Sequence, residues 1–164
     1  MRGKKMKAII LAAGKGERLK KYTAKIPKPM LTVKREIVLE HNLRWLKKNG
    51  IDEVYINLHY FPEVIRDYFV DGSPWGIKIK YSHENEILGT AGAVRKILNE
   101  YVSLEGEGDY LVIYGDNFYP DNYQLAGLIN FHLAKQGILT LDCIPHGIKM
   151  NLFAAASRLL TKII

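Results

Sequence analysis

Cysteine is nearly absent from this chain of 164 residues, and the one cysteine, Cys143, excludes an internal disulfide and a cysteine metal cluster. Long apolar runs are also absent, and none approaches the roughly 20 residues that a membrane-spanning helix needs. The apolar run at residues 8–13 is too short for the core of a signal peptide, so we expect a cytoplasmic protein with no membrane partner. Repeats, low-complexity tracts and an interdomain linker are missing too. With 48% hydrophobic residues, the chain suits one domain with a substantial core.

Acidic residues are scarce at the start of the chain. Residues 1–35 hold 12 of the 24 Lys and Arg residues and one acid, Glu17, which gives +11, whereas the remainder carries 12 − 16 = −4. Such a basic segment indicates a phosphate-bearing ligand, nucleic acid or a solvated basic face. Aromatic residues that would stack on single-stranded bases are missing from it, apart from Tyr22. We therefore favour a small phosphate ligand and no nucleic acid, with a solvated face as the alternative.

Apolar periodicity alternates between strand and helix along the chain. Strands are predicted at residues 8–13, 53–58, 76–82, 110–114 and 138–141, and helices at 37–49, 62–69, 90–101 and about 121–137. This alternation predicts an α/β fold of three layers, a mostly parallel Rossmann-like sheet with helices on both faces. Ligands bind such sheets at the carboxyl ends of the strands, where Gly14, Gly115 and Asp116 all lie.

A glycine-containing loop follows the first predicted strand. Gly14 and Gly16 allow a tight backbone whose N–H groups can face an anion, which suits the phosphates of a nucleotide. The loop differs from a dinucleotide-binding loop because Leu19 stands where the third glycine would be, and no Gly-Lys-Ser/Thr follows as in a Walker loop. A plain strand-to-helix turn is the alternative explanation of these glycines.

Two cations and a carboxylate complete the pattern. The fork of Arg18 matches phosphate oxygens, and Lys28 lies between two prolines that fix the local backbone. Asp116 follows a predicted strand, and a carboxylate in that place beside a phosphate is a natural Mg²⁺ ligand. A surface salt bridge, a solvated lysine and a turn aspartate are the respective alternatives.

Together these motifs resemble the signature of sugar-1-phosphate nucleotidyltransferases. The family pattern is a strand, a Gly-x-Gly-Thr/Ser-Arg-Leu loop and a Lys inside Pro-Lys-Pro, here with Glu17 in place of Thr or Ser. Three further stretches fit in the family's order: Asp-Gly-Ser-Pro-Trp-Gly at 71–76, Leu-Gly-Thr-Ala-Gly-Ala at 88–93 and Gly-Asp-Asn at 115–117. The resemblance covers residues 7 to 141.

The resemblance implies transfer of a nucleoside monophosphate from a nucleoside triphosphate to a sugar-1-phosphate, with Mg²⁺ as cofactor and release of pyrophosphate. It implies Arg18, Lys28 and Asp116 as catalytic residues, with Asp116 as the metal ligand. The implied nucleotide-binding residues are Ala12, Ala13, Gly14, Lys15, Gly16, Glu17, Gly89, Thr90 and Ala91. Small residues at a helix start let a base or sugar approach closely, although Thr90 also suits a plain helix cap. Neither the base nor the acceptor follows from these motifs.

Asn57 and His59 end a predicted strand and resemble an Asn-x-His stretch of some relatives, but a structural role is the better expectation for His59. Glu84 and Glu86 precede the predicted helix at 90–101, and the pattern gives little reason to place either at the ligand.

The resemblance fails after residue 141. The family's Glu-Lys-Pro stretch, which holds the sugar phosphate, and a later Asp that completes the metal site are both missing. We therefore predict a nucleotide-binding part at residues 1–141 and a divergent tail at 142–164, with an amphipathic helix over 151–164. We expect a chain shortened by a frameshift or as a natural variant, whose open sheet edge promotes homo-oligomers.

Two other classes of function remain open. The missing acceptor residues favour a non-catalytic nucleotide-binding or assembly module. A dinucleotide-binding domain is the third class, and the absent third glycine and the Pro-Lys-Pro stretch argue against it.

Overall fold

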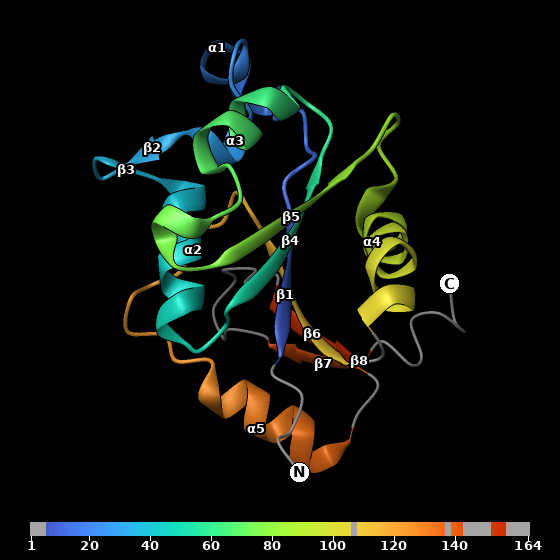
Figure 1. Ribbon diagram of the computed structural model, residues 1–164. Coiled ribbons are helices and arrows are strands. Elements are labelled where there is room, and N and C mark those ends of the chain that lie inside the picture. The colour runs from blue at the N-terminus through green and yellow to red at the C-terminus, as the bar shows by residue number, and fades with distance from the viewer. Residues whose placement is uncertain (1–5, 106–107, 137–138, 143–151, 157–164) are drawn as a thin grey trace.

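The computed structural model describes residues 6–105, 108–136, 139–142 and 152–156 (Figure 1). The strands are β1 Lys7–Leu11, β2 Thr32–Val33, β3 Glu36–Ile37, β4 Glu53–Leu58, β5 Lys78–His83, β6 Asp109–Tyr114, β7 Leu139–Asp142 and β8 Leu152–Ala156. The α-helices are α1 Lys20–Thr23, α2 Val38–Lys48, α3 Pro62–Phe69, α4 Gly89–Glu105 and α5 Ala126–Lys135. Three short 3-10 helices complete the fold: η1 Glu17–Leu19, η2 Lys28–Met30 and η3 Ser73–Trp75.

A six-stranded sheet of order β5-β4-β1-β6-β8-β7 forms the centre of the molecule. Four of its strands, β5, β4, β1 and β6, run parallel, which confirms the predicted α/β fold with a mostly parallel sheet. The chain builds outward from β1 to β4 and β5, and then places β6 on the opposite side of β1. Such a reversal leaves a crevice outside the carboxyl ends of the two strands where the order switches, here β1 and β6.

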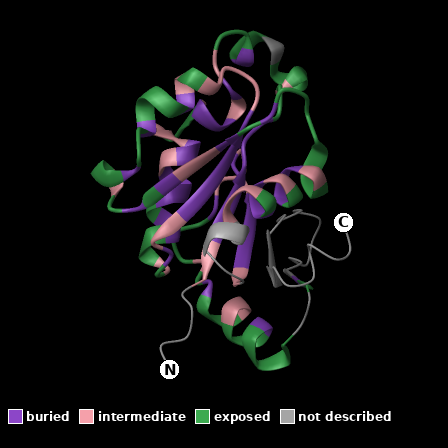
Figure 2. Ribbon diagram, turned by 45° about the vertical axis from the view of Figure 1, so that its right-hand side comes forward, coloured by how far each residue is buried: buried purple, intermediate pink, exposed green. Residues whose placement is uncertain are grey.

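Alternate residues of β1 face two different hydrophobic cores, as strand geometry requires. Ala8 and Ile10 lie in the larger core with the buried residues of α2 and α3, whereas Ile9 and Leu11 pack against α4. Figure 1 shows α2 and α3 on one side of the sheet and α4 on the other, and Figure 2 shows the buried strands between them. Across the described residues, no helix has both the length and the apolar character that crossing a membrane requires.

Strand β8 contradicts the helix predicted over residues 151–164. It lies between β6 and β7 and pairs antiparallel with both, so part of the predicted tail belongs to the same sheet as the preceding residues. Its sequence, Leu-Phe-Ala-Ala-Ala, contains good helix formers. The second edge of β6, however, offers backbone partners that only a strand can pair with, and such tertiary pairing overrides local propensity. Residues 143–151, with Cys143, and 157–164 lie outside the described residues.

Helix α5 begins after Leu125, later than the start predicted near residue 121. Two side chains, Trp45 of α2 and Asn49 directly after α2, bind the backbone of the preceding segment and keep it non-helical. The Nε1 of Trp45 donates to the Tyr123 carbonyl at 2.9 Å, and the Oδ1 of Asn49 accepts from the Leu125 N–H at 2.9 Å. These partners lie 76 to 78 residues away in sequence, so local patterns could not reveal the late start.

Candidate active site

The carboxyl ends of β1, β4, β5 and β6 border a cleft of about 720 Å³. It lies at the β1/β6 switch point, where a doubly wound sheet is expected to bind its ligand. The residues that line it are Leu11, Ala12, Ala13, Gly14, Lys15, Gly16, Glu17, Arg18, Leu19, Lys28, Pro29, Asn57, Glu84, Ile87, Gly89, Thr90, Tyr114 and Asp116.

The glycine-containing loop leaves β1 and turns into η1 at the mouth of this cleft. Gly16 has a φ of +63°, which favours glycine, and an added Cβ would lie 2.9 Å from the Cγ2 of Thr23. The buried Thr23 hydroxyl lies 3.1 Å from the carbonyl oxygens of Gly16 and Leu19, and the Leu19 N–H donates to the Gly16 carbonyl at 2.8 Å. A side chain on Gly14, by contrast, would meet nothing within 4 Å. The loop is thus fixed on its inner side and open toward the cleft.

Lys28 and Asp116 form an ion pair across the cleft, although 88 residues separate them in sequence. Pro27 and Pro29 are buried on either side of Lys28, so the backbone that carries the lysine is fixed. Asp116 follows Gly115, whose N–H donates to the Leu11 carbonyl at 2.9 Å and so ties the end of β6 to β1. The two charged groups are each about one-third exposed, with 32% and 27% of their side chains accessible.

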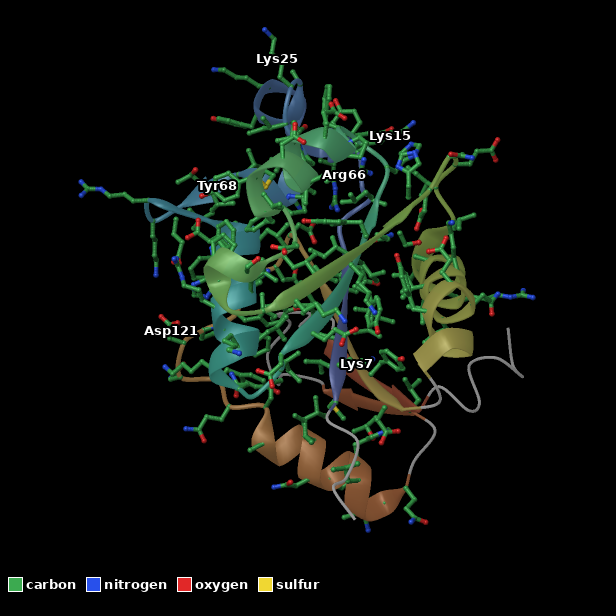
Figure 3. The ribbon with its side chains drawn as sticks, in the orientation of Figure 1. Lys7, Lys15, Lys25, Arg66, Tyr68 and Asp121 are labelled. Atoms are coloured by element: carbon green, nitrogen blue, oxygen red, sulfur yellow. The ribbon has the colours of Figure 1, made fainter. Side chains whose placement is uncertain are left out.

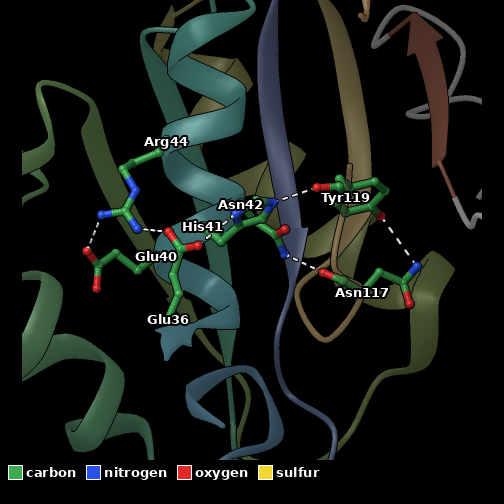
Figure 4. Close-up of polar contacts among 7 residues, drawn as sticks. All are labelled: Glu36, Glu40, His41, Asn42, Arg44, Asn117 and Tyr119. Carbon is green, nitrogen blue, oxygen red and sulfur yellow. Dashed lines mark hydrogen bonds and ion pairs between the residues drawn. The ribbon is translucent and has the colours of Figure 1, made fainter. Parts of the chain in front are cut away.

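Helix α2 holds the segment that carries Asp116 (Figure 4). The Nδ2 of the fully buried Asn42 donates to the carbonyl of Asn117 at 2.7 Å and to that of Gly115 at 3.3 Å. These two carbonyls lie on either side of Asp116. Asn42 could not be predicted from the sequence, because its partners lie 73 to 75 residues away and no local motif marks it.

His41 anchors the same segment two residues further along. Its Nε2 lies 2.5 Å from the Tyr119 carbonyl, its Nδ1 lies 3.1 Å from a carboxylate oxygen of Glu36, and its ring stacks on Phe118 at 3.9 Å. These three contacts fix the position of the imidazole ring beside the segment that carries Asp116. Arg44 pairs with the same Glu36 carboxylate and with Glu40 (Figure 4).

Asn57 and Glu84 also line the cleft, at the ends of β4 and β5. Both side chains are almost fully buried. Glu84, which the sequence pattern gave little reason to place at the ligand, lines the cleft, as does Ile87. Thr90 contributes through its hydroxyl, which lies 2.9 Å from that of Tyr114.

Nearly all predicted site residues come together in this cleft. Those that line it are Ala12, Ala13, Gly14, Lys15, Gly16, Glu17, Arg18, Lys28, Gly89, Thr90 and Asp116. Ala91 does not line the cleft; it is exposed within the first turn of α4. His59 is structural as predicted, since its Nδ1 lies 2.9 Å from the Glu84 carbonyl oxygen.

The basic N-terminal segment does not serve the cleft alone. Lys7 lies at the opposite end of β1 from Lys15 (Figure 3), and its Nζ contacts the Tyr55 hydroxyl at 3.0 Å. Lys25 points away from the molecule in the same view. The phosphate-binding expectation therefore applies to Lys15, Arg18 and Lys28, which line the cleft, rather than to the whole basic segment.

Comparisons with known proteins agree with this geometry. The family described as Nucleotidyl transferase matches residues 7–149, which is most of the chain and extends past residue 141, where the motif resemblance ended. The chain belongs to the nucleotidyl transferase family. A family relative from Campylobacter jejuni, D-glycero-alpha-D-manno-heptose 1-phosphate guanylyltransferase, is 46% identical over 114 residues, which cover 70% of this chain and 49% of the relative. UTP–glucose-1-phosphate uridylyltransferase of Synechocystis is 35% identical over 147 residues, covering 83% of this chain and 36% of the relative.

Among solved structures, HddC from Yersinia pseudotuberculosis superposes on this nucleotidyl transferase chain with a TM-score of 0.77 at 23% identity. The alignment covers 96% of this chain and 80% of HddC, and it supports the shared fold. The chain spans between 36% and 49% of the length of the two curated relatives above.

Proposed function

We propose that this chain transfers a nucleoside monophosphate from a nucleoside triphosphate to a sugar-1-phosphate and releases pyrophosphate. One observation carries the proposal. Lys28 and Asp116, which are 88 residues apart in sequence, line one cleft at the β1/β6 switch point together with the glycine-containing loop and Arg18. Family membership supports the same reaction class.

In this reaction an oxygen of the sugar phosphate attacks the α-phosphorus, and the bond from that phosphorus to the bridging oxygen of pyrophosphate breaks. The protein need not supply a covalent nucleophile; it must align the two phosphates and neutralise their charge. We assign the backbone of the loop around Gly14 and the side chain of Arg18 to the departing pyrophosphate. We assign Lys28, whose backbone is fixed by its two prolines, to the phosphate that reacts.

Mg²⁺ fits the cleft through Asp116. Among the described residues no group of three or more His, Cys, Asp or Glu side chains could hold a metal by itself. Mg²⁺ in nucleotide sites is instead held by one or two carboxylates together with phosphate oxygens, which one aspartate beside a phosphate loop can satisfy. Lys28 pairs with the Oδ2 of Asp116, so we assign the other carboxylate oxygen to the ion. When bound, the ion would neutralise and orient the phosphates.

We propose GTP as the nucleotide and a heptose or hexose 1-phosphate as the acceptor. The 46% identity to a heptose 1-phosphate guanylyltransferase supports this choice over the uridylyltransferase, to which identity is 35%.

Calorimetric titration with GTP, dTTP, UTP and CTP in the presence of Mg²⁺ tests the nucleotide half of the proposal. We expect selective GTP binding, weakened at least about tenfold in Asp116→Ala, which corresponds to about 1.4 kcal/mol. Because Asp116 would act through the ion, the deficit should disappear when Mg²⁺ is chelated. Asp121→Ala is the matched control, since this exposed aspartate lies outside the cleft and should bind GTP like the wild type.

A pyrophosphate-release assay with GTP and a panel of sugar-1-phosphates tests the transfer itself. Release that requires both substrates and Asp116 supports the enzyme. GTP binding without release would instead support a non-catalytic nucleotide-binding module. No binding of any nucleotide would contradict both.

A further inference from the structure

Three hydrogen bonds, two of them buried and the third partly buried, link the ends of β1, β4 and β5 in a continuous series. The Ala12 N–H donates to the Oδ1 of Asn57 at 2.6 Å, and the Nδ2 of Asn57 donates to the Oε1 of Glu84 at 2.8 Å. The Leu88 N–H then donates to the other oxygen of Glu84 at 3.1 Å. Asn57 is 3% exposed and Glu84 is 1% exposed, so water contributes little to either side chain.

The direction of every bond in this series is fixed by chemistry. A backbone N–H can only donate, so Ala12 and Leu88 supply donors at the two ends. Asn57 must therefore turn its oxygen to Ala12 and its amide nitrogen to Glu84, and a flipped amide would break both bonds. Glu84 must accept at both oxygens, which a glutamine could not do. Burial in a low-dielectric site strengthens such charge-assisted bonds and makes their loss costly.

These hydrogen bonds join the glycine-containing loop, which the proposed function assigns to the phosphates, to the segment with Gly89 and Thr90, which the family resemblance implies for the nucleotide. Ala12 is two residues before Gly14, and Leu88 immediately precedes Gly89, which has a φ of +69°, and Thr90. Both segments line the cleft: we assign the first to the phosphates and the second to the base and sugar. His59 adds a contact to the same corner, because its Nδ1 lies 2.9 Å from the Glu84 carbonyl oxygen.

We propose that Asn57 and Glu84 are positioning residues that hold the glycine-containing loop and the segment at residues 87–90 at a fixed separation, and thereby set nucleotide affinity. This inference rests on the proposed function for its ligand. A triphosphate held on one segment and a base held on the other must fit both at once. A change in the separation of the segments therefore weakens the nucleotide without removing any group that contacts it.

Reversing the polarity of the pair tests the inference. In Asn57→Asp two carboxylates face each other, and in Glu84→Gln one amide N–H group faces a donor, so each single variant loses a bond. The double variant N57D/E84Q restores all three hydrogen bonds. The carboxylate introduced at position 57 can accept from the Ala12 N–H and from the amide introduced at position 84. The oxygen of that amide can accept from the Leu88 N–H. Its net charge is also that of the wild type. Glu86→Gln is the matched control, since it removes the same charge from an exposed neighbour outside the cleft lining.

Amide hydrogen exchange gives a readout that needs no ligand. We expect the amides of Ala12 and Leu88 to lose protection together, at least about tenfold, in each single variant and to regain it in the double variant. E86Q should exchange at those two amides like the wild type. Independent behaviour of the two amides, or no recovery in the double variant, would overturn the inference whatever the nucleotide result.

GTP titration at about pH 8, where carboxyl groups are normally ionised, gives the functional readout. We expect about tenfold weaker binding in each single variant, and recovery to within about threefold of wild type in the double variant. Unchanged affinity in the single variants would overturn the positioning role. A double variant as weak as E84Q would show that Glu84 acts by direct contact with the nucleotide, which also overturns it. If the wild type binds no nucleotide while the exchange result holds, the proposed function fails and the positioning role fails with it, but the hydrogen-bonded link itself stands.

Discussion

Some side chains around the Asp116 segment must act as hydrogen-bond donors, and an acceptor in the same place could not replace them. Asn42 shows this most clearly, because its amide nitrogen serves the two carbonyls that lie on either side of Asp116 (Figure 4). The side chain is completely buried, and its Oδ1 has no partner among the described residues. The position of the catalytic carboxylate in the proposed reaction thus depends on a residue that never borders the cleft.

Asn42→Asp should therefore destabilise the fold although it barely changes the shape of the side chain. It replaces the donor with a charged acceptor facing two carbonyl oxygens, and we expect a loss of about 2 to 4 kcal/mol in the free energy of unfolding. Urea denaturation measures the loss. Asn122→Asp makes the same change at an exposed position and should stay within about 0.5 kcal/mol of the wild type. Equal stability of the two variants would contradict the role given to Asn42.

Residues of the site differ in how far the sequence could predict them, and the reason is the distance to their partners. Gly14 and Asp116 lie in short motifs directly after a strand, and Lys28 lies between two prolines. Such local patterns are visible in the sequence, so these residues could be predicted as site residues. Asn42 has partners 73 to 75 residues away, and the bond from Asn57 to Glu84 spans 27 residues. Only the folded sheet brings such pairs together, so no local pattern could assign them.

The connection between α3 and β5 is a structural element with a strict requirement for glycine. Residues 71–76 belong to the motifs that suggested the family, yet they form a turn with η3 and lie outside the cleft lining. Gly72 has a φ of +85°, and a Cβ placed on it would lie 2.1 Å from the Ile77 carbonyl oxygen. The Oδ1 of Asp71 accepts from the Ser73 N–H at 3.0 Å. The turn sets the start of β5, the strand that leads to Glu84.

Gly72→Ala should lower the free energy of unfolding by at least about 2 kcal/mol, because the new methyl group meets backbone and the left-handed conformation disfavours alanine. Thermal denaturation measures the change. Gly127→Ala is the contrasting control in α5, where the added group meets nothing within 4 Å. We expect that variant to be slightly stabilised, by about 0.5 to 1 kcal/mol, as is usual for alanine in a helix. Destabilisation of similar size in both variants would count against the steric explanation.

Elements were predicted well where local chemistry decides them and poorly where pairing decides them. The strand at residues 53–58 and the helix at 62–69 have the bounds that the sequence predicted, since alternation of side chains marks the one and Pro62 opens the other. Strand β8 was predicted as a helix. Its conformation depends on the free edge of β6, a long-range feature that an alanine-rich segment does not reveal.

At the scale of the whole molecule, several buried or partly buried tyrosines pack in or against the cores, and their ionisation is coupled to folding. Burial raises the pKa of Tyr119 to about 12 and likewise that of Tyr81 to about 12. Burial also raises the pKa of Tyr110 and Tyr101. The folded state therefore holds these phenol protons more tightly than the unfolded state, in which the pKa is near 10.

Stability should accordingly be full below about pH 10 and fall as the pH rises from there toward about 12. Denaturant titrations at a series of alkaline pH values, with tyrosinate absorbance as a second probe, measure this loss. Tyr81→Phe should keep its stability near neutral pH, because the Tyr81 hydroxyl has no partner among the described residues, and should lose less in alkali. A free energy of unfolding that stays constant across this range would contradict the coupling.

The central position of β1 has a consequence for how the protein is made. Ala8 pairs with Val54 on one side and with Leu111 on the other, which are 46 and 103 residues later in the chain. At typical rates of about 5 to 20 residues per second, a ribosome needs roughly 5 to 20 s between the synthesis of β1 and that of its second neighbour. Throughout that time an apolar strand with an unpaired edge has emerged without its partner, which makes the nascent chain a substrate for chaperones and prone to aggregation. The strand that leads into the glycine-containing loop is therefore synthesised before the other strands of this sheet, and its pairing is complete only once β6 has emerged.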